Sequence, residues 1–336
     1  MHELRKDPLL GRWVAVLNNS KPPSGYSLFH ENESEKDCLF CSGREHDLPA
    51  EIMSVPDQRP DRPSKKWWTR VVPNLSPVFR VEGDLGRRGE GMYDKMNSVG
   101  ATEIIIESPD HSIRPEDIGL DQMARVLITY MARIADLEKD PRLRYTLIYK
   151  NSGISSGAVY SHPISHLVST PVIPKRVKEE LDGAKQYFAY KERCIFCDFI
   201  SEELRSGDRI IIETRHFVAF CPYASKFPFE FWILPKRHSC AFQDTGPEEI
   251  EDMALIFSAG LKKLRALFDG VAFNYFIHSA PNRIPRKNHW HTLGEDFHWH
   301  LEVMPRLLRT SGFEWGSGFY ISPTSPEEAA KYLREA

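Results

Sequence analysis

The chain repeats itself, and this duplication constrains its fold more than any other feature of the sequence. The motif CLFC at 38–41 has a counterpart, CIFC, at 194–197. The run GATEIIIESPDHS, which ends at Ser112, matches FPFEFWILPKRHS, which ends at Ser239. In both runs an apolar, β-prone stretch leads through a proline to a His-Ser pair. The repeat therefore predicts two similar units, each with a strand that delivers a histidine.

The same order of elements continues after each His-Ser pair. An acidic helix start and an amphipathic stretch come first, followed by a second strand, RYTLIYKN or FNYFIHSA, and then by a histidine cluster, SHPISHLV or FHWHLEVMPR. The amphipathic stretches carry apolar residues at helical spacing, which predicts two core-facing helices. These residues are Ile118, Met123, Val126, Leu127, Tyr130, Ile134 and Leu137 in the first half, and Ile250, Met253, Ile256, Leu261 and Leu264 in the second.

We predict an α+β fold of two tandem units, each an antiparallel sheet with packed helices. The units are expected at residues 1–172 and 173–336, and each is long enough to bury its own core. The segment PKRVKEELDGAKQYFAYKER follows the boundary and is expected to be a connecting helix. Its apolar residues at helical spacing are Val177, Leu181, Ala184 and Phe188.

Each half supplies the ligands of a tetrahedral zinc site. A CxxC pair presents two thiolates to one ion, and two histidines from distant strands complete the coordination. Six cysteines in 336 residues are too sparse for a disulfide scaffold, and free core cysteines with surface histidines are the alternative. We expect two zinc ions per chain, one for each set. Both are expected to be structural, because a site with four protein ligands has no open position for substrate. The predicted ligands are Cys38, Cys41, His111 and His162 in the first half, and Cys194, Cys197, His238 and His298 in the second.

Charge and hydropathy argue against several classes of partner. The chain has 44 Lys and Arg against 47 Asp and Glu, so no basic field favours nucleic acid or an anionic membrane. No stretch approaches the ~20 apolar residues of a membrane span, and the N-terminus MHELRKDPLLGRW lacks the apolar core of a signal peptide. We expect a cytoplasmic protein that binds neither nucleic acid nor membrane.

Six segments of the chain resemble the galactose-1-phosphate uridylyltransferase family of the histidine-triad superfamily. They extend from about residue 4 to the C-terminus and read RKDPLLGRWV, CLFC, RVVPNLSPVF, GATEIIIESPDHS, NSGISSGAVYSHPISHLVSTPVIPKR and FHWHLEVMPRLLRTSGFEWGSGFYISP. The resemblance implies two histidine-triad-like halves, a homodimer, and zinc at the first predicted set. It also implies that a histidine nucleophile takes a nucleoside monophosphate from a nucleotide sugar and passes it on. Nucleotide contacts are implied near Asn74, Asn151 and Gly157.

The catalytic run departs from the family pattern. The family has His-Pro-His-x-Gln, preceded three residues earlier by a serine that helps hold phosphate. Here the run is His-Pro-Ile-Ser-His from His162 to His166, and Val159 replaces the serine. Isoleucine cannot attack phosphorus, donate a proton or accept one. Ile164 therefore stands where the nucleophile is expected.

Two histidines are candidates for catalysis in its place. His166 lies one pleat, about 6.6 Å, beyond Ile164 on the same strand face, where it is expected to take the glutamine's part and donate to phosphate. His300 follows the predicted ligand His298 by two residues, as a triad nucleophile does. Glu302, however, stands where the triad has its third histidine, and the resemblance implies that this second-half run is a metal or structural segment of the family.

Three functions remain open from the sequence. The first is a nucleotidyltransferase or phosphorylase that acts on a nucleotide sugar, either by direct attack of the acceptor or through another histidine. The second is a nucleotide-binding, zinc-stabilised protein that has lost transfer. The third, a nucleic-acid-processing enzyme, lacks a basic patch with interleaved aromatics. In some family members a glutamate at the position of Glu180 holds iron, whereas the thiolates of CIFC favour zinc.

Overall fold

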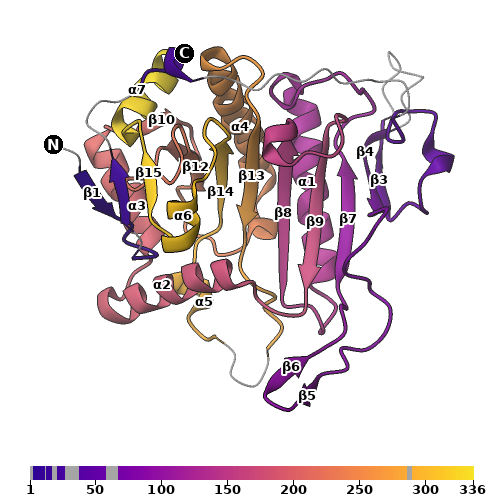
Figure 1. The fold of residues 1–336 in the computed structure, drawn as a ribbon. Coiled ribbons are helices and arrows are strands. Elements are labelled where there is room, and N and C mark those ends of the chain that lie inside the picture. Colours follow the sequence, from indigo (N-terminus) through magenta and orange to yellow (C-terminus); the bar gives the residue numbers. More distant parts are fainter. Residues whose placement is uncertain (1–2, 12, 17–20, 27–37, 58–66, 286–289) are drawn as a thin grey trace.

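A ten-stranded antiparallel sheet runs through both halves of the chain (Figure 1). The structure is a computed structural model that describes residues 3–11, 13–16, 21–26, 38–57, 67–285 and 290–336. Within these residues the strand order is β10-β11-β12-β14-β13-β8-β9-β7-β4-β3. The strands are β3 (Met53–Pro56), β4 (Trp67–Pro73), β7 (Ala101–Ile106), β8 (Tyr145–Ser152), β9 (Ile164–Thr170), β10 (Ile210–Glu213), β11 (Phe217–Phe220), β12 (Phe231–Pro235), β13 (Phe273–His278) and β14 (His300–Pro305).

The predicted duplication is visible in the order of these strands. From the outer edge to the middle, the first half contributes β3-β4-β7-β9-β8 and the second contributes β10-β11-β12-β14-β13. The halves meet where β8 pairs with β13, with Ser152 opposite Phe273 and Ile148 opposite Ile277. The predicted α+β fold of two similar units is therefore confirmed, and the two units share one continuous sheet.

Helices cover both faces of the sheet. Helices α1 and α4 pack against each other on one face, behind the strands in Figure 1, and α7 packs on α4. Helix α2 lies on the opposite face, in front of the strands. The helices are α1 (Leu120–Leu137), α2 (Lys175–Lys191), α3 (Ile195–Ser206), α4 (Pro247–Leu267), α5 (Leu293–Asp296), α6 (Gly312–Ser317) and α7 (Pro326–Glu335). Among the described residues, no helix has the length and apolar character that a membrane crossing requires.

The amphipathic patterns explain where the helices lie. All twelve predicted stripe residues are buried against the sheet or against each other; eleven lie on α1 and α4, and Ile118 lies just before α1. Helix α4 begins with Pro247, which fits the first turn because it has no N–H to leave unpaired, and Glu248 and Glu249 favour the positive helix start. The predicted connecting helix is α2, in which Val177, Leu181 and Ala184 are buried.

The two ends of the chain meet in a smaller sheet. Strands β1 (Glu3–Lys6) and β2 (Trp13–Val16) are antiparallel, and β2 pairs in parallel with β15 (Tyr320–Ser322). A separate hairpin consists of β5 (Arg88–Glu90) and β6 (Tyr93–Lys95). The N-terminal strands therefore lie against the second half, and the division of the chain at residues 172 and 173 stays a prediction.

Candidate active site and metal centres

The four predicted ligands of the first half converge beside the start of β9. Cys38 and Cys41 lie on one turn, His111 lies in the loop after β7, and His162 precedes β9 by two residues. The Sγ atom of Cys41 is 3.5 Å from Nδ1 of His111, and Sγ of Cys38 is 3.6 Å from Nδ1 of His162. One possible ligand atom from each of the four residues lies within 4.8 Å of the others.

The second half brings its four predicted ligands together in the same way. Cys194 immediately precedes α3, and Cys197 lies in the first turn of that helix. The Sγ atom of Cys197 is 3.3 Å from Nδ1 of His238 and 3.6 Å from Nδ1 of His298. The four ligand atoms again lie within 4.8 Å of one another. The duplication therefore extends from the strands to the arrangement of the cysteines and histidines.

The hydrogen bonds behind the histidines are duplicated as well. Nε2 of His162 donates to the carbonyl oxygen of Ser108 at 2.8 Å, and Nε2 of His298 donates to that of Pro235 at 3.0 Å. Each carbonyl belongs to the residue three positions before the other histidine of its set. A proton fixed on Nε2 leaves the lone pair of Nδ1 directed at the thiols, as metal binding requires.

The donor sets fit closed tetrahedral zinc sites. Two thiols and two imidazoles are a common structural zinc set, and zinc binding needs a neutral histidine. Burial lowers the pKa of His162 to about 4, which keeps its imidazole neutral. Hydrogen bonds from Cys194, His238 and His298 lower the pKa of the Cys197 thiol. The second set can therefore present a thiolate at Cys197, and the first a neutral imidazole at His162.

Ile164, at the expected position of the nucleophile, lies in an apolar cluster. It is the first residue of β9, pairs with Ile106 of β7, and is only 4 % exposed. Its cluster also contains Phe40 and Ile104. Val159, in place of the phosphate-holding serine, is by contrast 82 % exposed. The structure therefore gives the side chain of Ile164 a packing role and no polar partner.

His166 lies one pleat further along the same face of β9. It is opposite Ile104 on β7 and opposite Tyr149 on β8, and its ring stacks on Tyr149 at a centroid distance of 5.0 Å. Its side chain is half-buried, and no described residue forms a hydrogen bond with its buried Nδ1 atom. Burial lowers the pKa of His166 below its usual value, so the ring is neutral at pH 7.

The three expected nucleotide contacts are only partly brought together. Nδ2 of Asn151, near the end of β8, donates to the carbonyl oxygen of Gly157 at 3.1 Å. Gly157 has a φ of 87°, which a residue with a side chain rarely adopts. Asn74 lies two strands away from β9, after the end of β4, and its Oδ1 accepts from the backbone N–H of Ser76 at 2.9 Å.

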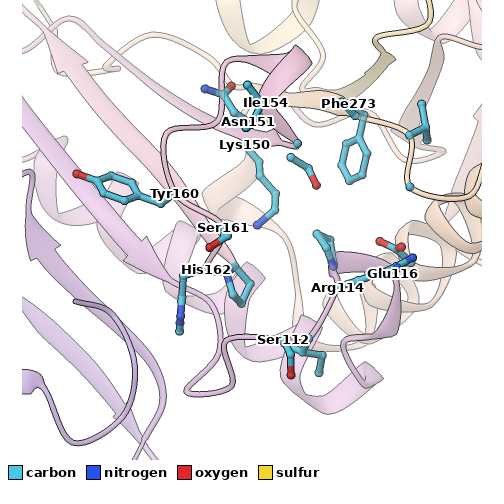
Figure 2. A pocket seen from close by; sticks show the side chains of 18 of the residues that line it. Ser112, Arg114, Glu116, Lys150, Asn151, Ile154, Tyr160, Ser161, His162 and Phe273 are labelled. Atoms are coloured by element: carbon cyan, nitrogen blue, oxygen red, sulfur yellow. The ribbon is translucent and has the colours of Figure 1, made fainter. Parts of the chain in front are cut away.

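A pocket opens beside the first ligand set, and Lys150 extends into it from β8 toward Ser161 and His162 (Figure 2). Its volume is about 400 Å³. Ser161 lies 3.0 Å from Nε2 of His111, which connects the pocket wall to the ligand set. The lining includes His111, Arg114, Asn151, Ser161 and Phe273, so both halves contribute to it.

Lys150 belongs to a buried polar network that joins the halves. Its Nζ atom donates to Oε2 of Glu107 at 2.6 Å and to the carbonyl oxygen of Ile164 at 2.9 Å. The other oxygen of Glu107 accepts hydrogen bonds from Tyr130 of α1 at 2.8 Å and from Tyr275 of β13 at 3.0 Å. The network fixes the start of β9 from the face opposite His166.

His300, the second catalytic candidate, lies in the interior and is 0 % exposed. The rings of Phe196 and Trp232 stack on it at 5.0 and 5.2 Å. Its Nδ1 atom lies 3.1 Å from the carbonyl oxygen of His298. This burial keeps substrate phosphates away from its imidazole and argues against nucleophilic attack by His300.

A buried polar cluster surrounds His300. Nδ1 of His278 lies 2.7 Å from Oε2 of Glu180, and the His278 ring stacks on that of His300 at 4.9 Å. Glu180, His278 and His300 offer three possible ligand atoms within 4.8 Å of one another. Glu302 lies between Nε2 of His300 and Nζ of Lys226, at 3.7 Å from each. The lysine places a positive charge inside this cluster.

Sequence reasoning missed several residues of these sites. Lys150 and His278 lie in the two strands that the repeat predicts, but nothing marked them as polar contacts. The alternation of side chains along the strands could have placed His278 on the face that carries His300. Arg306 directly follows β14 and lines a pocket with the 153–157 loop, and no sequence motif marked it.

Comparison with known proteins places this architecture in a family. A family profile described as galactose-1-phosphate uridyl transferase, C-terminal domain, matches residues 180–330. An ADP-glucose phosphorylase from Arabidopsis thaliana is 34 % identical over 339 residues, which cover 99 % of this chain and 92 % of the relative. A galactose-1-phosphate uridylyltransferase from Thermotoga maritima is 27 % identical, with 100 % and 98 % of the two chains covered.

Solved structures agree with these sequence matches. A crystal structure of an ADP-glucose phosphorylase from Arabidopsis thaliana with bound ADP-glucose superposes with a TM-score of 0.83 at 33 % identity, covering 100 % of this chain and 99 % of the other. A structure of a uridylyltransferase has a TM-score of 0.76 at 24 % identity and covers 100 % and 98 %, which supports the fold.

Proposed function

The chain belongs to the galactose-1-phosphate uridylyltransferase family, in the histidine-triad superfamily, and on this basis we propose that it is a nucleotidyltransferase. It transfers a nucleoside monophosphate from a nucleotide sugar, or a related phosphoanhydride, to a sugar phosphate or to phosphate. The observation that carries the proposal is the Asn151–Gly157 hydrogen bond of 3.1 Å, which joins two of the expected nucleotide contacts. Gly157 lies in the loop between β8 and β9, and residues 153–159 of this loop are called the phosphate loop below. ADP-glucose is the first donor to test, since a 34 % identical relative is named ADP-glucose phosphorylase.

Transfer in this chain proceeds by direct displacement. Because Ile164 is apolar and buried, no covalent nucleotide can form at the position where the family has its nucleophile. An oxygen of the acceptor phosphate attacks the α-phosphorus and forms a new P–O bond. The bond from the α-phosphorus to the oxygen of the sugar phosphate breaks, and the electron pair leaves with the sugar phosphate. No proton has to move, so positioning and charge stabilisation supply the catalysis.

His166 acts as a hydrogen-bond donor to the α-phosphate. A proton on Nδ1 would be a buried donor without an acceptor among the described residues, which costs about 1–3 kcal/mol. The neutral ring therefore carries its proton on Nε2. A protonated Nε2 cannot attack phosphorus, but it can donate to a non-bridging oxygen. His300 differs, because its Nδ1 has an acceptor in the carbonyl of His298.

Two zinc ions hold this scaffold. We assign one to Cys38, Cys41, His111 and His162, and the other to Cys194, Cys197, His238 and His298. When bound, each zinc is structural, since four protein ligands leave no open position for substrate. His162 is a ligand only two residues before Ile164, so the first zinc fixes the start of β9.

A nucleotide-binding protein without transfer activity is the second candidate. The changes at Val159, Ile164 and His166 favour it, because all three lie where the family's phosphate chemistry takes place. Both candidates predict nucleotide binding, and only the first predicts product. A measurement of product formation therefore distinguishes the two candidate functions.

We further propose that the protein is a cytoplasmic homodimer. The homodimer is supported by large apolar side chains that lie exposed on the 153–159 loop and on α6, of the kind that a subunit interface covers. They are Val159 and Phe313, with exposed fractions of 82 and 56 %. Sedimentation equilibrium tests the dimer and cell fractionation tests the location; a monomer at micromolar concentration, or recovery with membranes, would contradict these assignments.

The proposed function is tested by incubating the protein with ADP-glucose or UDP-glucose and either phosphate or a hexose 1-phosphate. Chromatography then measures the nucleoside diphosphate or new nucleotide sugar. Asn151→Ala is expected to lower the rate at least tenfold, since it releases the phosphate loop. Asn97→Ala is the matched control, because Asn97 bonds only in an exposed loop, to the carbonyl of Asp84. Nucleotide binding without product would favour the second candidate, and the absence of both would contradict the proposal.

A further inference from the structure

We propose that Arg306 binds the phosphate group that is exchanged at the α-phosphorus, whether this belongs to a sugar phosphate or is inorganic phosphate. The inference rests on the proposed function for the identity of the anion, but the anion site itself is argued from the geometry. It assigns a residue of the second half to the substrate site of the first half.

Arg306 lies on the same face of the sheet as Asn151 and His166. Its backbone N–H donates to the carbonyl oxygen of Ala272 at 2.7 Å, which continues the pairing of β14 with β13 by one residue. In that pairing Met304 is opposite Asn274, and Asn274 is opposite Asn151 on β8. Because side chains alternate along a strand, Met304 and Arg306 share this face.

A chain of amides holds the guanidinium toward the first half. Nε of Arg306 donates to Oδ1 of Asn274. Nδ2 of Asn274 donates to Oδ1 of Asn151 at 2.7 Å and to the carbonyl oxygen of Ser156 at 3.0 Å. Asn151 in turn donates to Gly157. One set of hydrogen bonds therefore aligns Arg306 with the loop that is expected to hold the nucleotide phosphates.

The charge of Arg306 has no carboxylate partner within the described part of the chain. Its contacts there are the bond to Asn274 and the ring of Phe227, which lies 5.2 Å from the guanidinium carbon. Glu230 is the nearby acid, but its oxygens accept from the backbone N–H groups of Lys226 and Phe227 and from the indole of Trp232. Burial and the charge of Arg176 lower the pKa of Arg306, and the charges of Glu230 and Tyr320 oppose this shift without reversing it.

This guanidinium lines a cavity of about 450 Å³ that both halves build. Ile154 and Ser155 of the phosphate loop form one wall, and the segment after β14, including Thr310 and Trp315, forms the other. Arg309 adds a second positive charge to the lining. The two terminal nitrogens of an arginine match two oxygens of a phosphate, and a planar fork makes this contact better than an ammonium. The cavity therefore suits a phosphate with a sugar attached.

Calorimetry with inorganic phosphate and with glucose 1-phosphate tests the assignment without any need for turnover. Arg306→Gln is expected to weaken both affinities at least tenfold, because it removes a charge-assisted contact, while the affinity for AMP or UMP changes by less than about twofold. Arg306→Lys keeps the charge but not the fork or the Nε bond, so an intermediate loss is expected. Arg205→Gln is the control for net charge, because Arg205 lies on the surface of α3, paired with Glu202.

Several results would overturn the assignment. One is a folded Arg306→Gln variant that binds both phosphates as tightly as the wild type does. Another is an equal loss of phosphate affinity in Arg306→Gln and Arg205→Gln. If Arg306→Gln does not fold, Arg306→Lys decides, and unchanged affinity in that variant contradicts the proposal. Wild-type protein that binds neither phosphate at millimolar concentration also contradicts it. Phosphate binding that depends on Arg306, in a protein that transfers nothing, would leave this site standing and refute only the proposed function.

Discussion

The ammonium group of Lys150 lies 2.9 Å from the carbonyl oxygen of Ile164. The same nitrogen forms a buried ion pair with Glu107, and both side chains are at most 3 % exposed. The residue that replaces the expected nucleophile is thus held by its backbone from one face of the sheet, while its side chain packs on the other. Direct displacement depends on precise placement of the reacting groups, and therefore on a fixed β9.

Lys150→Met is expected to destabilise the fold by about 3–5 kcal/mol, because it leaves the Glu107 carboxylate buried without its charge partner. Lys150→Met with Glu107→Leu should recover part of this loss, since it removes the unpaired charge. Urea denaturation measures the free energy of unfolding of both variants. Lys139→Met is the control, because its pair with Asp136 is exposed and should contribute less than about 1 kcal/mol. Equal effects at Lys150 and Lys139 would show that the buried pair is not formed.

Purified protein is expected to carry about two zinc ions per chain, as measured by elemental analysis. Cys38→Ser should reduce this to about one and should lower the melting temperature far more than Cys240→Ser, because Cys240 has no CxxC partner and lies outside both ligand sets. Folded protein without zinc would contradict both sites, and a content near one would leave only one half loaded.

The stability of the protein is expected to depend on pH through His166. Burial holds its folded pKa below the unfolded value of about 6.5, so the unfolded chain binds the proton more readily. The corresponding stability is fully present above pH 6.5 and is lost as pH falls toward the folded pKa. His166→Gln should therefore lose less stability than the wild type between pH 7 and pH 5, as measured by chemical denaturation. If the free energy of unfolding falls equally with pH in the wild type and in His166→Gln, His166 is not buried as described.

The paired motifs of the sequence were sufficient to predict which cysteines and histidines come together in each half, because each CxxC and each histidine recurs in the same order. The alternation of side chains also placed Ile164 and His166 on one face. The shared sheet could not be predicted, since the pairing of Ser152 with Phe273 joins strands that are far apart in the chain.

The missed residues have no local signature. Arg306 gains its position through Asn274, and His278 gains its partner through Glu180 on another element. Such contacts depend on how the two halves dock, which no spacing within either repeat encodes. His300 shows the converse, because its spacing from His298 fits a triad nucleophile whereas the packing of Phe196 and Trp232 buries it.

Restoring the family's residues should restore covalent chemistry. In Ile164→His, combined with Val159→Ser and His166→Gln, the new imidazole would lie on the strand face that carries His166. We expect this variant to form a nucleotidyl-histidine that can be trapped with a labelled nucleotide sugar, and the wild type to form none at residue 164. An adduct mapped to His166 or His300 in the wild type would show that the nucleophile has moved.

The stereochemical course at the α-phosphorus tests direct displacement most directly. A donor that is chiral at this phosphorus, with one oxygen replaced by sulfur, is converted by the wild-type enzyme, and the configuration of the product is determined by phosphorus NMR. One in-line displacement inverts the configuration, whereas two successive displacements through a covalent histidine retain it. We expect inversion with the wild type and retention with the Ile164→His, Val159→Ser, His166→Gln variant. Retention with the wild type would contradict direct displacement.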